Sequence, residues 1–154
     1  IPLAYYRSNS FKKPTRDVDD GKDPIGDLNE TLAKMDPAYV YCGKDWRTPT
    51  IDQIKELIKE CNWIWTENYQ NSEVKGYIVR SSKNNNEIFI PVTGYYINNK
   101  KVSEANSGFY NSRLSTTTIP NNRNVLFFDN TQKTSDKSIL GTYACPIRPV
   151  KRVK

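Results

Sequence analysis

The spacing of apolar residues along the chain predicts one amphipathic helix over about residues 50–61. Thr50 with Gln53 three residues later matches a capping box, in which side chains satisfy the free N–H groups of a first helical turn. Pro49 disfavours helical geometry at Thr48, so the chain is expected to be extended just before the helix begins. The polar residues fall on the opposite face, so the helix packs against an apolar partner. Its apolar face consists of Ile51, Ile54, Leu57, Ile58 and Cys61.

After this helix the period of the pattern changes from helical spacing to two, which indicates strands. If the segment 62–66 is extended, Trp63 and Trp65 lie on the same face. The closing strand contains two prolines, which favour an edge or a bulge. The expected strands are 76–81 and 87–91, joined as a hairpin by an Asn-rich turn, a shorter hairpin of 94–97 with 101–103, then 125–128 and 143–150.

The first forty residues and the polar segment 103–124 show little periodicity. A short strand at 4–6 and a helical turn or two over 27–35, which Pro37 would end, are the elements expected before residue 41. The chain of 154 residues fits one domain. We therefore predict a single α+β domain over 1–154 whose first part, 1–40, is rich in loops.

The composition of the chain excludes several kinds of functional site but says less about the fold. The chain has no histidine, which excludes triads with a histidine base, zinc–histidine sites and haem ligation by histidine. Its net charge of +6 would suit an anionic partner. The lysines and arginines are scattered, however, except in the tail 148–154, so we expect a solvated basic surface and no nucleic-acid partner. No run of about twenty apolar residues predicts a membrane span.

The three cysteines do not have the paired spacing of a zinc site. A reactive thiolate needs a helix N-terminus or nearby cations, and the cation close in sequence is Arg148, near Cys145. The residues allow two interpretations: either one structural disulfide with a third, unpaired thiol, or three buried thiols. Neither these cysteines nor the seven glycines, which form no phosphate-binding loop, predict an enzyme.

Three segments, in this order, resemble the Fibrobacter succinogenes major paralogous domain, which is widespread in exported Bacteroidetes proteins. Residues 41–50 resemble its opening Cys-Pro-x-Gly-Trp-Arg-Leu-Pro-Thr, 86–95 its Asn-x-Ile-Phe-Leu-Pro-Ala-Ala-Gly-Tyr, and 147–150 its closing Val-Arg-Pro-Val. The chain departs from the family at 109–112 and 144–146. The resemblance implies a C-type-lectin-like core over 41–150, related to formylglycine-generating enzymes and to the variable proteins of diversity-generating retroelements.

The resemblance also implies an exported protein, at the cell surface or anchored to the outer membrane, that works as a non-catalytic binding or adhesion module. Its ligand would be a glycan or a protein. A formylglycine-generating-type enzyme and a structural fimbrial or cell-envelope subunit are the alternatives. The calcium-binding tripeptides of C-type lectins do not occur in the sequence, so no metal or other cofactor is expected. If the protein is exported, Cys42–Cys145 is the preferred bridge, with Cys61 as the odd thiol.

The expected ligand-binding loops lie between residues 103 and 132, because tyrosine, asparagine, serine and arginine are the residue types of adaptable binding surfaces. An ordinary polar loop is the alternative. Trp46 and Trp63 are expected to pack beneath the helix, and Arg47 to bond to backbone or stack on an indole, whereas Trp65 is expected to be partly exposed. The candidate ligand-binding residues are Phe109, Tyr110, Asn111, Arg113, Asn121, Asn122, Arg123, Asn124 and Trp65.

Overall fold

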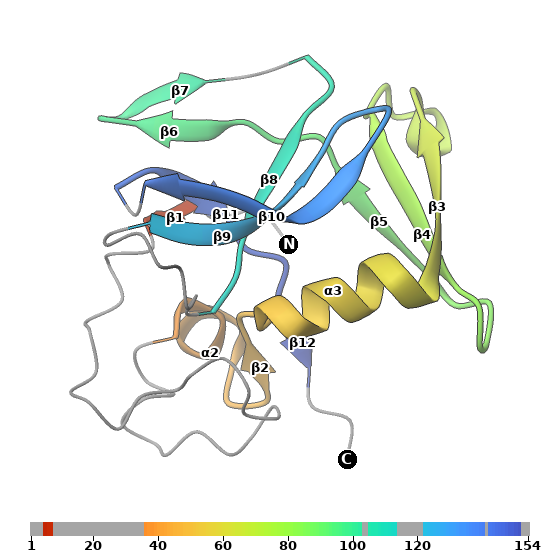
Figure 1. The fold of residues 1–154 in the computed structure, drawn as a ribbon, viewed down its shortest axis with the longest axis horizontal. Coiled ribbons are helices and arrows are strands. Elements are labelled where there is room, and N and C mark those ends of the chain that lie inside the picture. The colour runs from red at the N-terminus through yellow and green to blue at the C-terminus, as the bar shows by residue number, and fades with distance from the viewer. Residues whose placement is uncertain (1–4, 8–35, 103–104, 114–121, 141, 152–154) are drawn as a thin grey trace.

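The computed structural model describes residues 5–7, 36–102, 105–113, 122–140 and 142–151. Within them the protein is an α+β structure of two helices and mostly antiparallel sheets (Figure 1), which confirms the predicted class. The elements are β1 (Tyr5–Arg7), α2 (Pro37–Cys42), β2 (Trp46–Arg47), α3 (Ile51–Glu60), β3 (Cys61–Thr66), the 3-10 turn η2 (Tyr69–Asn71), β4 (Gly76–Ser81), β5 (Glu87–Pro91), β6 (Tyr95–Ile97), β7 (Lys100–Val102), β8 (Gly108–Asn111), β9 (Asn122–Phe128), β10 (Lys133–Leu140), β11 (Ala144–Pro146) and β12 (Val150–Lys151).

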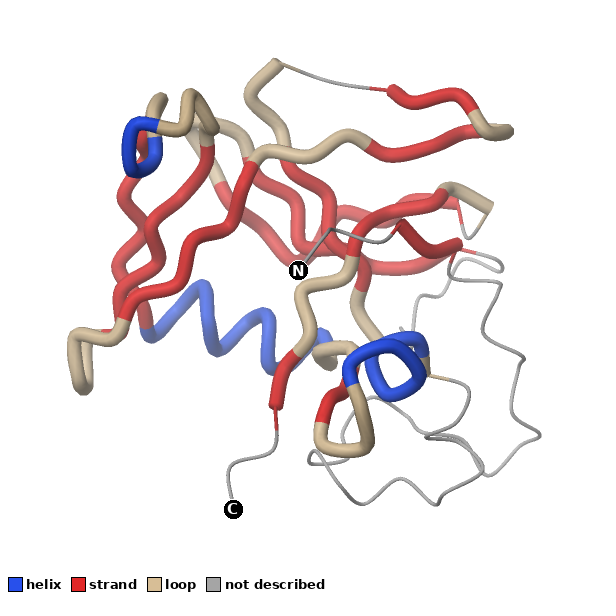
Figure 2. Tube along the Cα trace, turned by 180° about the vertical axis from the view of Figure 1, so that it is seen from behind, coloured by secondary structure: helices blue, strands red, loops and turns tan. Residues whose placement is uncertain are grey.

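The strands form four small sheets, and every paired set of strands is antiparallel. Two of them, β3-β4-β5 and β10-β9-β8, have three strands each, and α3 runs beneath them in Figure 1. The four-stranded sheet has the order β1-β11-β6-β7. Seen from behind in Figure 2, α2 and the β12-β2 pair gather near the start of α3. This arrangement brings the first and last parts of the described chain together.

Helix α3 begins and ends close to the predicted limits of 50 and 61. Thr50 is the N-cap, and its hydroxyl oxygen accepts a hydrogen bond from the N–H of Gln53 at 3.1 Å. The side-chain oxygen of Gln53 accepts in return from the N–H of Thr50 at 2.9 Å, so the capping box is confirmed. Ile54 is buried on the apolar face. The chain leaves the helix directly into β3 at Cys61.

Helix α2 is an element that was not predicted from the sequence. Pro37 occupies its first turn, where the missing N–H costs nothing. Asp36 is the N-cap, and its carboxylate accepts from Ala38 N at 2.8 Å and from the hydroxyl of Thr48 at 2.7 Å. The carboxylate thus ties the start of α2 to the segment before α3. The helix predicted over 27–35 lies outside the described residues.

The strands with a regular period were predicted well, whereas those in polar segments were not. The hairpin β4-β5 has the predicted limits, and its turn places Asn85 at a φ of 60°. Strand β8 lies within the segment 103–124, which was read as polar loop, although all four of its residues are buried. Strand β10 was missed because its first six residues are polar and show no alternation, and its pairing with β9 has a register shift between Thr134 and Lys137. The single strand predicted over 143–150 is two strands, β11 and β12.

The ring of Tyr77 connects the two three-stranded sheets. It makes edge contacts with Trp63, Trp65 and Phe128 at centroid distances of 5.4, 5.1 and 5.4 Å. Its hydroxyl donates to the backbone oxygen of Asp129 at 2.7 Å. The main buried cluster around it consists of Ile54, Tyr77, Val79, Ile90, Tyr110, Leu126 and Phe128. A second cluster lies between β8, β9 and β11 and consists of Phe109, Val125, Phe127 and Cys145.

Replacing Tyr77 should therefore destabilise the whole domain. We expect Tyr77→Ala to lower the free energy of unfolding by about 3–5 kcal/mol through loss of buried aromatic area. Tyr77→Phe keeps the ring and should cost only about 1 kcal/mol, the contribution of one hydrogen bond. Tyr41→Ala, at a side chain 73% exposed, is the control and should change stability by less than about 0.5 kcal/mol. Urea unfolding curves measure all three, and equal midpoints for Tyr77→Ala and Tyr41→Ala would contradict the central role of Tyr77.

Candidate functional site

Three connections meet at one end of the two three-stranded sheets: the β3–β4 loop (67–75), the end of the β7–β8 connection (105–107) and the β9–β10 turn (129–132). The ammonium of Lys75 donates to the side-chain oxygen of Asn106 at 3.4 Å, which joins the first two. The bond from Tyr77 to Asp129 joins the third to β4. Loops that converge on a scaffold of sheets are a common place for binding residues.

The β3–β4 loop has a defined conformation that its own hydrogen bonds maintain. Tyr69 N–H donates to Val74 O at 2.9 Å, and Glu73 N–H donates to the side-chain oxygen of Asn68 at 2.7 Å. Gln70, Asn71 and Glu73 all have positive φ, at 50°, 58° and 61°. Residues other than glycine seldom adopt these angles, and clusters of them occur at functional loops. The loop's own hydrogen bonds therefore favour this one conformation.

An aromatic stack attaches this loop to the sheet. The rings of Tyr69 and Phe89 are 3.9 Å apart between centroids and inclined by only 4°. Gly76 lies beside them with a φ of 158°, and a Cβ there would come within 2.3 Å of the Ile90 carbonyl oxygen and 3.0 Å of the Phe89 ring. The absence of a side chain at Gly76 thus allows β4 and β5 to approach beneath the stack.

Trp65, Glu67, Lys75 and Asn106 form a chain of polar contacts along this end, which we call the Trp65 network. The indole N–H of Trp65 donates to Glu67 at 2.7 Å, and the ammonium of Lys75 lies 2.8 Å from the other carboxylate oxygen. The hydrogen bond from Lys75, followed by that from Trp65, holds the pKa of Glu67 below its usual value. The carboxylate is consequently charged at neutral pH and still accessible to solvent.

The β9–β10 turn beside the Trp65 network is organised by a second carboxylate. One oxygen of Asp129 accepts from the hydroxyl and N–H of Thr131 at 2.7 and 2.8 Å, and from Gln132 N–H at 2.9 Å. These bonds, led by that from the Thr131 hydroxyl, lower the pKa of Asp129 to about 2. The residues that follow β9 thus form a turn that the Asp129 side chain stabilises.

The geometry of the Trp65 network suits binding through stacking and hydrogen bonds. The indole of Trp65 is half-buried, and its edge contact with Tyr77 fixes its orientation. Beside it lie a charged acceptor, an ammonium donor and an amide. An aromatic surface with a few fixed polar groups is the usual composition of a site that binds a polar organic ligand.

Four of the residues expected to face a ligand are buried. Phe109, Tyr110, Asn111 and Arg113 are between 0 and 4% exposed. The Tyr110 hydroxyl donates to Pro91 O at 2.8 Å, and the Asn111 amide donates to Cys145 O at 3.2 Å. These side chains thus pack between sheets, and a ligand on the surface would not touch them. The four residues therefore lie outside the Trp65 network.

The remaining residues of that expected surface lie away from the Trp65 network. Asn121 falls outside the described residues. Asn122 and Arg123 begin β9 and pair with β10 at Leu140 and Ile139, and half-buried Asn124 follows them. They occupy the opposite end of β9 from the Asp129 turn. Of the nine candidates, the structure therefore places only Trp65 at the network.

The polar members of the network were not predicted. Glu67 could have been suspected, since it follows Trp65 by two residues, which is a short enough distance for a side-chain contact along the chain. Lys75 and Asn106 lie 8 and 39 residues beyond Glu67, so no local pattern connects them. Only the fold brings them together.

The other tryptophans and Arg47 have structural roles. Trp63 packs against the main buried cluster, which includes Ile54 of α3, as predicted, and it donates its indole N–H to Leu57 O at 3.1 Å. Trp46 lies on β2 beside Lys151, whose ammonium is 5.7 Å from its ring. The guanidinium of Arg47 donates to the backbone oxygens of Lys44 and Trp46, each at 2.8 Å, which confirms the expected backbone bonding. The ring that it covers belongs to Tyr39, at 5.0 Å, and not to an indole.

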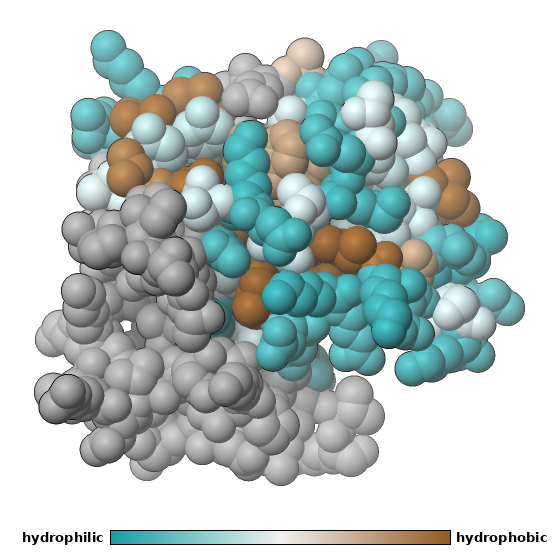
Figure 3. Space-filling model, in the orientation of Figure 1, coloured by the Kyte–Doolittle hydropathy of each residue, from teal (hydrophilic) through white to brown (hydrophobic). Residues whose placement is uncertain are grey.

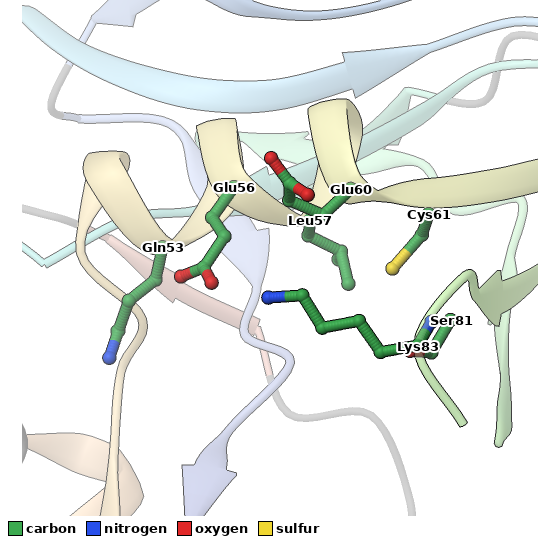
Figure 4. Close-up of a pocket in the computed structure, with 7 residues that line it drawn as sticks. All are labelled: Gln53, Glu56, Leu57, Glu60, Cys61, Ser81 and Lys83. Carbon is green, nitrogen blue, oxygen red and sulfur yellow. The ribbon is translucent and has the colours of Figure 1, made fainter. Parts of the chain in front are cut away.

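All three cysteines are free thiols in the structure. Cys145 is fully buried, which raises its pKa to about 12. Cys61 borders a pocket of about 200 Å³ that lies along α3 (Figure 4). Its pKa is raised by burial and then by Glu56 and Glu60, against a smaller opposite effect of Lys83. Both thiols are thus protonated at neutral pH, and the Cys42–Cys145 bridge stays a prediction.

The described residues contain no cluster of three or more metal-binding side chains. None of the helices in that part of the chain is long and apolar enough to cross a membrane. Comparisons of the chain with protein-family models, curated proteins and solved structures give no match.

The acid stability of the protein should depend on Asp129. Because its folded pKa of about 2 lies below the ordinary 3.8, its charge stabilises the fold above about pH 4, and this contribution is lost as the pH falls towards 2. We expect Asp129→Asn to lower stability at pH 7 by about 1 kcal/mol, a value kept small because the group is exposed. The variant should lose less stability than the wild type between pH 4 and 2. Thermal unfolding of both proteins measured between pH 4 and 7 and down to pH 2 tests this prediction. Parallel curves of stability against pH for the two proteins would contradict the role of Asp129.

Proposed function

We propose that the chain is a non-catalytic, exported binding or adhesion domain with a C-type-lectin-like fold, which acts at the cell surface and recognises a glycan or a protein without a metal ion. The α+β arrangement of small antiparallel sheets around one main helix is compatible with this fold. The three family-like segments support it, since the first includes the N-cap of α3 and the second includes β5. Localisation rests on the resemblance alone.

The observation that carries this proposal is the ordered Trp65 network at the meeting point of three connections. A sugar ring offers a flat apolar face to an indole and hydroxyl groups to its neighbours. Glu67 provides an acceptor, Asn106 an amide and Lys75 a donor. Since the hydrogen bonds of the loop already hold these groups in place, little conformational entropy is lost on binding. We therefore favour a glycan over a protein as the ligand.

The state of the thiols supports a binding domain over an enzyme of the formylglycine-generating type. Such an enzyme works through a reactive cysteine pair, and a thiolate is the reactive form. Burial keeps Cys145 protonated, with a pKa of about 12, and Cys61 has two carboxylates beside it that disfavour its thiolate. The two cysteines also belong to different clusters of the core.

The Trp65 network can be tested with a glycan array followed by titration of the best ligand. We expect Trp65→Ala to weaken binding at least about tenfold, because it removes the stacking surface. Glu67→Gln keeps the shape but loses the charge and should weaken binding by a smaller factor. Tyr41→Ala removes an exposed aromatic side chain from α2 and is the matched control, with unchanged affinity. Normal binding by Trp65→Ala would place the site elsewhere, and the absence of any glycan ligand would remove the glycan proposal.

Binding should be insensitive to metal removal and to pH near neutrality. The chain has no histidine, and the pKa of Glu67 is held below its usual value, so the network keeps its charges between about pH 5 and 8. Affinity should fall only in acid, as Glu67 becomes protonated. Calorimetric titrations with and without EDTA across this range measure both effects. Loss of binding in EDTA that calcium restores would contradict the metal-free site.

A further inference from the structure

Strand β3 is an open edge of its sheet. Within the described residues β4 is its only partner strand. Figures 1 and 2 both show β3 at the outer margin of the molecule, with no other element beyond it. Figure 3 shows an apolar patch at this margin, and Ile64 on β3 is 43% exposed.

The backbone bonds of the neighbouring strand show which groups of β3 lie on the open edge. Ser81 N–H donates to Asn86 O, and Val92 N–H donates to Lys75 O, so the odd-numbered residues of β4 bond to the β5 side. Ser82 N–H donates to Glu60 O, so the even-numbered residues bond to the β3 side. Because the two sets alternate along an antiparallel strand, the outward N–H and C=O groups of β3 belong to its odd-numbered residues. These residues are Cys61, Trp63 and Trp65.

Strand β3 also lacks the features that keep an edge from pairing. Its six residues include no charge and no proline, and its pairing with β4 has no register shift. The other edges are protected: β5 has Glu87 and Pro91, β7 has two lysines, and β10 is charged and bulged. Strand β8 is buried, and its Phe109 N–H donates to the Thr93 hydroxyl. Strands β1, β2 and β12 have only two or three residues.

We propose that β3 pairs with β3 of a second copy of this chain, antiparallel and about a two-fold axis at Ile64. The side chains of a sheet alternate between faces, so the register must place odd residues opposite odd ones and even opposite even. Centring the pair on Ile64 satisfies this condition. Ile64 then faces Ile64 of the second copy, Trp63 faces Trp65, and Asn62 faces Thr66. The β3-β4-β5 sheet of one copy and that of the other then form one sheet of six strands.

A second copy fits this edge because the strand is complementary to itself. Apolar, aromatic and polar residues each face their own kind, and exposed Ile64 gains an apolar partner. The flanking carboxylates do not oppose each other, since Glu60 would lie across from Asn68 and Glu67 across from Cys61. The pairing is argued from the edge of β3 alone, and it does not depend on the function proposed above.

Sedimentation equilibrium from about 5 to 500 µM protein tests the pairing, since mass action favours the dimer at the higher concentration. The wild type should show a monomer–dimer equilibrium. Ile64→Lys places two ammonium groups opposite each other and should weaken dimerisation at least about tenfold. Ile88→Lys, at an isoleucine of similar exposure (37%) on the protected strand β5, is the matched control and should dimerise normally. A wild type that stays monomeric throughout, or equal effects of the two substitutions, would overturn the proposal.

A second measurement needs no variant. In hydrogen exchange on the wild type, the amides of Trp63 and Trp65 should exchange several-fold more slowly at the high concentration, because the pairing covers them. The amide of Ile64 is directed at β4 in both states and should show no change, which makes it an internal control. Concentration-independent exchange at Trp63 and Trp65 would refute pairing through β3. A dimer with that result would point to another surface.

Discussion

The contact on which the rest of the structure depends is the edge-on packing of Tyr77 against Trp63, Trp65 and Phe128. No single sheet here is large enough to bury an apolar face alone, so stability requires that the sheets share one core. Tyr77 provides that junction, and its hydroxyl meets a backbone oxygen of the β9–β10 turn, so that the polar group is satisfied in a largely apolar setting. The same ring supports Trp65, so the candidate site depends on the core directly.

The parts of the fold that the sequence predicted are those that local physics determines. The capping box of α3 acts over four residues, and the β4-β5 hairpin is formed by an alternating pattern and an Asn-rich turn. Helix α2 was not predicted, because a proline fits either just after a helix or in a first turn, and the Asp36 N-cap before Pro37 is the local signal for the second. Strand β8 could not be recognised locally, since its burial results from contacts with distant strands.

The expected binding residues show why composition is a weak guide to a site. Tyrosine, asparagine and arginine suit a binding surface because they combine area with hydrogen-bonding groups, and the same properties suit a buried position between sheets. Tyr110 and Asn111 use their polar groups on the backbone oxygens of Pro91 and Cys145. Trp65 differs because it lies at the end of its strand, where its indole N–H reaches a carboxylate on the surface.

Both proposals involve strand β3, the ligand site through the Trp65 side chain and the dimer through backbone groups on the open edge. In an extended chain the side chains point above and below the sheet, whereas the backbone groups point along it. The indole of Trp65 is therefore directed towards Tyr77 and the Trp65 network, while its N–H and C=O lie on the open edge. The side chain of Ile64 lies on the other face and takes no part in that network. In the proposed dimer Trp65 also faces Trp63 of the second copy on the face that carries the network, so the paired edge would border the ligand site.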